Sequence, residues 1–179
     1  MFSRRIIMLL NLLYQRRSIR RYTDRPIEKS KIKALKEAAL LSPSSRNLRP
    51  WEFVFVEDQV KIDMLSKSKP NGSSFLAHAP LAIVIVGDPT LSDVWVEDCS
   101  ISAIILQLVA QDLGLGSCWI QIRKRMHNDT TSAEDYIKNL LALHHDKRIE
   151  AILSIGYPDE TRPCYIKEKL SWEKIYEIS

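Results

Sequence analysis

Glycine and cysteine are scarce in this sequence, and it contains no long apolar run. Five glycines in 179 residues predict loops that are short or shaped by proline. No apolar run reaches the length of about 18 residues that a membrane-spanning helix needs, which predicts that no segment crosses a membrane. The three cysteines are an odd number and form no CxxC pair, so neither a disulfide framework nor a zinc site is indicated.

The common sequence motifs of catalysis are also missing. There is no GxSxG nucleophile elbow, no GxGxxG dinucleotide fingerprint and no GxxxxGK[ST] phosphate loop. The four histidines, His78, His127, His144 and His145, lack the spacing of metal ligands, and the adjacent pair is expected to point in different directions. We therefore expect surface or core roles for them and no metal site. If the protein is an enzyme, its reactive group is expected to come from a cofactor.

The composition is that of an ordinary globular domain, with 45% hydrophobic and 27% charged residues. We expect a disordered N-terminal extension over residues 1–7 and a single domain over residues 8–179. Residues 1–13, MFSRRIIMLLNLL, have the charge and the apolar run of a signal peptide, but no small-residue cleavage site follows them. The sequence therefore predicts a cytoplasmic protein.

Positive charge is concentrated at one end of the chain. The formal net charge is +4; residues 1–25 hold seven arginines and one aspartate and contribute +6, so the other residues sum to −2. A nucleic-acid-binding surface would spread lysine and arginine along a whole face, so this pattern argues against nucleic acid. It fits either a compact anion such as a phosphate or a solvated basic tail.

Periodicity predicts alternating helices and strands. In one amphipathic helix, Ile32, Leu35, Ala39 and Leu41 are expected to share the buried stripe. The order of elements predicts an α+β or α/β sandwich around a sheet of about four strands. The expected helices are 8–16, 28–41, 58–67, 93–116 and 131–143, and the expected strands are 51–58, 79–89, 117–122 and 148–158.

The segment after Gly156 is too aromatic to be a disordered end. It carries Tyr157, Tyr165, Trp172 and Tyr176, and rings of this size are normally buried. We expect them to pack on a surface such as that of a second subunit.

Several blocks of the sequence resemble the nitroreductase family of small homodimeric flavoenzymes. RRSIRRYTDRPIE, followed by a helix and by SPSSRNLRPWEFVFV, is similar to the start of that family. HAPLAIVIV, DLGLGSCWIQ, LSIGYPDE and the basic KEKLSWEKIYE follow in the family's order. The resemblance extends from Leu9 to the end of the chain, and its first two blocks are the most specific.

The resemblance implies an α+β fold, a three-layer sandwich whose central, mostly antiparallel sheet of about four strands is flanked by helices. It also implies a homodimer in which the C-terminal tail wraps the partner subunit. FMN would bind in a site that both subunits share, and NAD(P)H would be the co-substrate.

The matching positions assign residues to the cofactor. Arg16, Arg17, Ser18 and Arg20 match the segment that holds the FMN phosphate and ribityl chain, and guanidinium groups suit a dianionic phosphate. Arg21 falls outside that pattern and is expected to face solvent. The resemblance places further residues along the flavin ring, with the asparagine of the first loop often supplied by the other subunit: Pro43, Ser44, Ser45, Asn47, Asn71, Leu115, Gly116 and Ser117.

Two positions depart from the family's pattern. Larger members place a lysine three residues after the asparagine that matches Asn71, where this chain has Ser74. The late basic pair that closes on the phosphate is matched by Lys167 and Lys169, with Arg162 as a rival.

The activity that the resemblance implies is that of an NAD(P)H-dependent FMN oxidoreductase. A hydride would pass from NAD(P)H through flavin N5 to a nitroaromatic, a quinone or a similar conjugated acceptor by a ping-pong mechanism. One alternative is a flavin-binding or storage protein without a dedicated acceptor. A more remote alternative is a basic-tailed nucleic-acid binder, for which the sequence has no recognisable module.

Overall fold

The computed structural model describes residues 2–178, with side chains from residue 8 onward. Four strands form one sheet in the order β1-β2-β4-β3, and all three neighbouring pairs are antiparallel. The strands are β1 (Trp51–Val56), β2 (Leu81–Gly87), β3 (Gly116–Gln121) and β4 (Arg148–Gly156). The helices are α1 (Phe2–Gln15), α2 (Lys29–Leu40), α3 (Gln59–Ser66), α4 (Trp95–Asp112) and α5 (Ala133–Leu141). Short 3₁₀ turns lie at Ser45–Asn47, Ser74–His78, Lys167–Lys169 and Trp172–Lys174.

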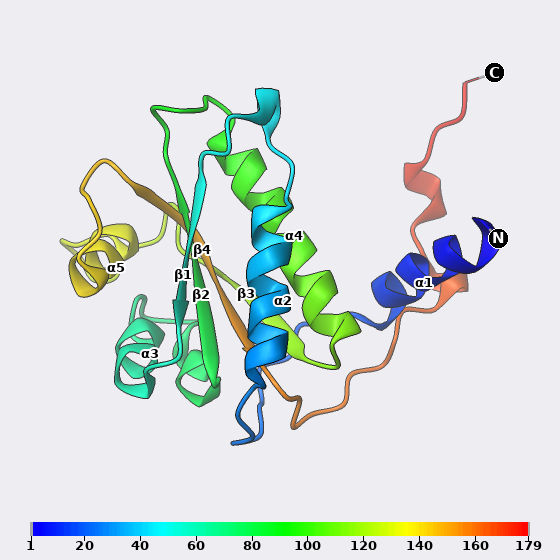
Figure 1. Ribbon diagram of the computed structural model, residues 1–179, viewed down its shortest axis with the longest axis horizontal. Coiled ribbons are helices and arrows are strands. Elements are labelled where there is room, and N and C mark those ends of the chain that lie inside the picture. Colours follow the sequence, from blue (N-terminus) through cyan, green and yellow to red (C-terminus); the bar gives the residue numbers. More distant parts are fainter. Residues whose placement is uncertain (1, 179) are drawn as a thin grey trace.

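The sheet is covered on both faces, as the three-layer α+β prediction requires. Helices α2 and α4 lie on one face, and α3 and α5 lie on the other (Figure 1). Every residue of β2 is buried, because this near-continuous apolar strand meets a helical layer on each side. Its alternate side chains divide between the two cores: Leu81, Ile83 and Ile85 pack with α2 and α4, whereas Ala82, Val84 and Val86 pack with α3 and α5.

Every predicted helix and strand is present, and most of them are shorter than predicted; α1 and β3 begin earlier than predicted. β1 stops at Val56 because Asp58 caps α3, where its carboxylate accepts the Lys61 N–H at 3.0 Å. α4 ends at Asp112 rather than at residue 116, since Gly114 takes a left-handed conformation with φ of 73°.

The predicted stripe of α2 was wrong at one position. Ile32, Leu35 and Ala39 are buried, but Leu41 is 82% exposed. Leu41 lies nine positions after Ile32, which is about two and a half helical turns, so it points to the opposite side of the helix.

Helix α1 lies beside the C-terminal segment and apart from the sheet (Figure 1). The Tyr165 N–H donates to the Tyr14 carbonyl at 2.9 Å. α1 begins at Phe2 rather than at residue 8, and residues 1 and 179 lie outside the described residues. The division of the chain into an extension and a domain at residue 8 stays a prediction. Within residues 2–178, no helix has the length and the apolar character needed to cross a membrane.

Candidate functional site

The arginine-rich segment leaves α1 and pairs with β3. Ser18 forms a parallel bridge with Ser117, in which the Ile19 N–H donates to the Ser117 carbonyl at 3.0 Å. Ile19 is buried, whereas the following Arg20 is exposed. Because side chains alternate along an extended chain, Ser18 and Arg20 lie on the side opposite Ile19.

Close packing holds this segment against the start of β3. A Cβ atom on Gly116 would lie 2.8 Å from the Cβ of Ile19, which is closer than non-bonded carbon atoms approach. Glycine therefore allows the two backbones to meet here, and a larger residue would push the arginine-rich segment away from the sheet.

Positively charged side chains surround a cavity at this junction. The cavity has a volume of about 250 Å³. Its guanidinium and hydroxyl groups are hydrogen-bond donors, and this donor set fits a dianion of the size of a phosphate group. The four residues predicted to hold a phosphate are thus brought together, and the C-terminal segment adds two more. The lining consists of Arg16, Arg17, Ser18, Arg20, Arg162 and Tyr165.

Glu160 links Arg162 to the backbone of the arginine-rich segment. Its Oε1 accepts the N–H of Arg20 at 2.6 Å and that of Arg21 at 3.3 Å. Its Oε2 lies 2.7 Å from Nη2 of Arg162. The Arg20 backbone hydrogen bond, with a further contribution from the Arg162 charge, lowers the pKa of Glu160. The ionised carboxylate therefore positions Arg162 at the cavity.

The C-terminal segment also supplies an aromatic wall. The guanidinium carbon of Arg17 lies 4.6 Å from the centre of the Tyr165 ring, within the range of a cation–π contact. Arg17 Nη1 also donates to the Pro163 carbonyl. On the inner side, Arg16 Nη1 donates to Gln107 of α4 at 3.5 Å. Contacts to α4 and to the tail thus orient the arginines from two directions.

A second group of predicted cofactor residues lies between α2 and β1. The group comprises Pro43, Ser44, Ser45 and Asn47. The Ser45 N–H donates to Oδ1 of Asp98 at 2.7 Å. Asp98 lies in the first turn of α4 and is only 2% exposed, so a buried carboxylate holds this loop in place. Sequence analysis missed Asp98, because nothing in a helical pattern marks a carboxylate that bonds to a distant loop.

The same loop has an unusual backbone. Arg46, Asn47 and Arg49 have positive φ values of 52°, 57° and 50°, a conformation that costs free energy for residues other than glycine. Local contacts hold it: the Arg49 N–H donates to Ser44 Oγ at 2.8 Å, and Arg49 Nε donates to Asn47 Oδ1 at 3.0 Å. Such strain is typical of loops that bind a ligand or a partner.

Helix α4 separates the two groups. Arg16 contacts Gln107, whereas Ser45 contacts Asp98. Nine residues of α4 correspond to about 14 Å along its axis. Residues 43–47 are not part of the lining of the arginine cavity. Within residues 2–178, one chain therefore does not bring all the predicted cofactor residues together.

Comparison with known proteins identifies the family of this chain. The model of the nitroreductase family matches residues 13–157, which is most of the chain. The chain belongs to the nitroreductase family. It is therefore an oxidoreductase.

Relatives of similar length agree with this assignment. A protein of Archaeoglobus fulgidus, whose name joins NADH dehydrogenase with NAD(P)H nitroreductase, is 34% identical over 160 residues, covering 87% of this chain and 88% of that protein. The structure of an FMN-dependent nitroreductase from Clostridium difficile R20291 has a TM-score of 0.93 at 46% identity, covering 95% of this chain and 99% of the other. A Desulfovibrio desulfuricans protein solved in complex with FMN has a TM-score of 0.76 at 23% identity, covering 96% of each chain, which shows the shared fold alone.

Of the late basic residues considered for the phosphate of this nitroreductase, the rival Arg162 is the one that lines the arginine cavity of the same chain. Lys167 and Lys169 lie in an exposed 3₁₀ turn of the tail and do not line the cavity, whereas Arg162 does. The Glu160 contact explains the difference, because it fixes the chain only two residues before Arg162. The sequence analysis did not place Tyr165 or Glu160 at the cavity, since their contacts join segments far apart in the chain.

Two other residues predicted to bind the cofactor, Leu115 and Asn71, do not line the arginine cavity. The Leu115 side chain is 2% exposed and packs in the core with α2 and α4, so it does not face a ligand. Asn71 is exposed in the turn before Gly72. Lys69 is partly buried beside this turn, and burial and the nearby charge of Arg125 lower its pKa.

One expectation about the histidines was wrong. His144 and His145 do not diverge, because their ring centres lie 4.4 Å apart. α5 ends at Leu141, so the pair lies in a turn rather than on a helix end, and helical geometry does not apply to it.

Proposed function

We propose that this nitroreductase binds FMN and passes a hydride from NAD(P)H to a nitroaromatic, a quinone or a similar conjugated acceptor. The observation that carries the proposal is the arginine-lined cavity beside β3. Its donors and its positive charge suit the dianionic phosphate of FMN. The family supports the same cofactor.

The chain's own residues divide into two functions in this proposal. The arginine cavity binds the phosphate, and Glu160 keeps Arg162 directed toward it. Gly116 and Ser117 bring the edge of β3 close to the phosphate segment, so the flavin ring would extend along that edge. Asn71 and Lys69 would supply hydrogen-bond donors on the far side of the ring, where Ser74 replaces the lysine of larger family members.

The chemistry that FMN supplies when bound is hydride transfer from NAD(P)H to an acceptor that occupies the same place afterwards, by a ping-pong mechanism. The protein's task is to bind and orient the rings and to exclude water from between them. Hydrogen-bond donors and fixed positive charge also stabilise negative charge that develops during the reaction. No side chain is required as a catalytic acid or base.

A second copy of the chain would complete the site. Because α4 keeps residues 43–47 apart from the arginine cavity of the same chain, Ser44, Ser45 and Asn47 would serve the cavity of the partner. Exposed apolar side chains on α1, α4 and the tail exceed what a monomer normally leaves in water, and a two-fold interface would cover them. They are Met8, Leu9, Leu10, Leu13, Ile101, Ile104, Tyr165, Ile166, Trp172, Ile175, Tyr176 and Ile178.

The reaction is proposed to take place in a reducing compartment, the cytoplasm. Cys99, Cys118 and Cys164 are all free thiols, which is the state that cytoplasmic reductants maintain.

The absorption spectrum of the purified protein tests the cofactor, and anaerobic mixing with NADH or NADPH tests the reaction. We expect oxidised flavin absorption, about one FMN per chain, that bleaches with at least one nicotinamide and returns when a quinone is added. Folded protein that takes up no FMN would refute the proposal as a whole. Bound flavin that neither nicotinamide reduces would favour the flavin-storage alternative.

Arg20 and Arg21 form a matched pair for the binding site. Arg20 lines the cavity, whereas the Arg21 side chain is 72% exposed and pairs with Asp159. Arg20→Ala is expected to weaken FMN binding by about 2–4 kcal/mol, as for a charged hydrogen bond removed from a desolvated partner. Arg21→Ala is expected to change it by less than about 1 kcal/mol. Equal effects would contradict the assignment.

A further inference from the structure

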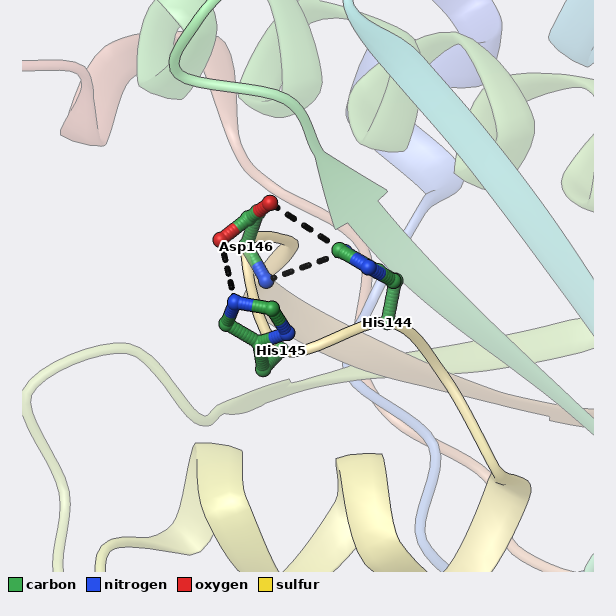
Figure 2. Close-up of side chains that lie close together, drawn as sticks. All are labelled: His144, His145 and Asp146. Atoms are coloured by element: carbon green, nitrogen blue, oxygen red, sulfur yellow. Dashed lines mark hydrogen bonds and ion pairs between the residues drawn. The ribbon is translucent and has the colours of Figure 1, made fainter.

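The turn between α5 and β4 carries two imidazoles and a carboxylate on one surface. His144, His145 and Asp146 are consecutive, and their side chains point toward one another (Figure 2). His144 Nδ1 lies 3.3 Å from Asp146 Oδ2, and His145 Nε2 lies 2.9 Å from Asp146 Oδ1. One potential ligand atom from each residue lies within 4.8 Å of the other two.

We propose that His144, His145 and Asp146 form a binding site for a divalent transition-metal ion such as Zn²⁺ or Cu²⁺. Imidazole nitrogen and carboxylate oxygen are the ligands that zinc accepts, at about 2.0–2.2 Å, and imidazole also suits copper. Two ligand atoms at opposite sides of an ion are about 4 Å apart at such bond lengths, so small side-chain rotations bring all three atoms into range. The three exposed side chains leave the other coordination positions open to water.

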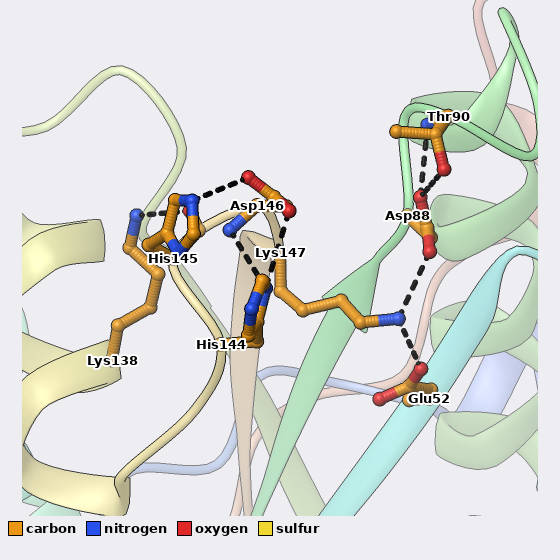
Figure 3. A network of polar contacts seen from close by, with 8 residues as sticks. All are labelled: Glu52, Asp88, Thr90, Lys138, His144, His145, Asp146 and Lys147. Carbon is orange, nitrogen blue, oxygen red and sulfur yellow. Dashed lines mark hydrogen bonds and ion pairs between the residues drawn. The ribbon is translucent and has the colours of Figure 1, made fainter.

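The backbone of the turn is held from two sides, which favours binding. The buried Lys138 donates to the His145 carbonyl at 3.2 Å. On the other side, Lys147 Nζ lies 2.5 Å from Glu52 Oε1 and 2.9 Å from Asp88 Oδ2 (Figure 3). A site on a backbone that is already ordered loses less conformational entropy when it binds.

The charges around the turn are compatible with a cation. Lys138 Nζ is paired with Asp135 at 2.8 Å, and Lys147 is shared between Glu52 and Asp88. Both nearby ammonium groups are thus balanced by carboxylates, and Asp146 adds a further negative charge.

The proposed metal site is separate from the arginine cavity. The turn precedes Arg148 at the start of β4, whereas Gly156 at its end pairs with Gly116 beside the cavity. The eight steps between them span about 26 Å. Metal binding and flavin binding are therefore expected to be independent, and the metal site does not rest on the proposed function.

Calorimetric titration of untagged protein with ZnSO₄ tests the site. We expect one Zn²⁺ per chain, and we expect His144→Ala, His145→Ala and Asp146→Asn each to weaken binding at least about tenfold. His78→Ala is the control, because His78 is exposed and lies on the 3₁₀ turn after α3, away from this turn. Unchanged affinity in the His144→Ala/His145→Ala double variant, or no heat of binding up to millimolar zinc, would overturn the proposal.

The electron paramagnetic resonance spectrum of added Cu²⁺ gives a second, structural readout. The wild-type spectrum is expected to contain splitting from two imidazole nitrogens, and each single histidine variant should lose one of them. Zinc should also raise the melting temperature of the wild type but not of the double variant. A copper spectrum that is identical in wild type and double variant would overturn the proposal even if some zinc binds.

Discussion

Asp98 Oδ1 accepts the Ser45 N–H at 2.7 Å, so a carboxylate at the start of α4 anchors the strained loop between α2 and β1. The second oxygen, Oδ2, accepts the Ser92 hydroxyl at 3.2 Å. Because Asp98 is almost fully buried, this pair of hydrogen bonds is expected to contribute more than a comparable contact at the surface.

Asp98→Ala is expected to lower the free energy of unfolding by about 2–3 kcal/mol, because it leaves a loop N–H and a hydroxyl without their acceptor. Asp98→Asn keeps one acceptor oxygen and should lose less than half of that. Urea unfolding measures both. Asp93→Ala is the control, since Asp93 pairs with Arg46 at the surface and its side chain is 78% exposed. A loss as large in Asp93→Ala as in Asp98→Ala would contradict the assignment.

Arg162 and the tail lysines should differ in their effect on cofactor binding. Arg162 lines the cavity, whereas Lys169 does not. Arg162→Ala removes a charge-assisted hydrogen bond worth about 1.5–3 kcal/mol and should raise the FMN dissociation constant about tenfold or more. Lys169→Ala should change it less than about threefold. Fluorescence titration of the apoprotein with FMN gives both dissociation constants. A larger increase in Lys169→Ala than in Arg162→Ala would show that the lysine closes the site.

Sedimentation at low micromolar concentration should give twice the chain mass of 20.7 kDa. Deletion of residues 163–179 is expected to weaken both the dimer and flavin retention. Ile104→Asp, on the exposed side of α4, should dissociate the dimer, because burying a carboxylate in an apolar interface is costly. Val60→Asp is the control: Val60 is 71% exposed but lies on α3, across the sheet. A folded, flavin-loaded monomer from the truncation would defeat the shared site.

The Tyr157 hydroxyl donates to Glu28 Oε2 at 2.5 Å. This hydrogen bond is the main reason that the pKa of Glu28 falls to about 2, followed by the residue's own backbone N–H and by Arg25. Since an unfolded glutamate has a pKa of about 4.3, the ionised side chain favours the folded state above that pH. Its contribution is lost as the pH falls toward 2.

Tyr157→Phe should therefore raise the pKa of Glu28 toward its ordinary value. Titration of the carboxyl ¹³C chemical shift measures the change directly. Tyr165→Phe, which alters a tyrosine at the arginine cavity instead, should leave the Glu28 titration unchanged. A Glu28 pKa that stays near 2 in Tyr157→Phe would mean that Arg25 and the backbone N–H are enough to lower it without the tyrosine.

Local sequence pattern predicted the elements and pointed to one part of the candidate site. The apolar run of β2 identified the central strand, and the clustered arginines allowed either an anion site or a solvated tail; both signals lie within a short stretch of chain. The cavity that these arginines line favours the anion site. The order of elements predicted an α+β or α/β sandwich, and the family resemblance favoured α+β. The error at Leu41 came from the assumption that it shares a stripe with Ile32, although nine positions are two and a half helical turns and place it on the opposite side.

Contacts between distant segments were not predictable in this way. Glu160 bonds to the backbone of Arg20 across 140 positions, and no local pattern encodes such a pairing. Asp98 acts through a contact of the same kind, since it accepts the N–H of Ser45, 53 positions away. The orientation of the His144 and His145 rings toward each other depends on where α5 ends. Helix ends are the part of a helix that is hardest to predict from sequence.

The strand order β1-β2-β4-β3 has a consequence for how the chain is made. β1 and β2 can pair once Gly87 has been synthesised, but β3 has a strand partner only when β4 follows, up to Gly156. Until then the only pairing described for β3 is the single bridge between Ser117 and Ser18, and its long edge toward β4 stays open; unpaired edges invite association with other chains. Arg162 and Tyr165, which line the arginine cavity, are synthesised later still. A chain that ends before residue 148 therefore lacks both the strand that pairs with β3 and the two cavity residues of the C-terminal segment.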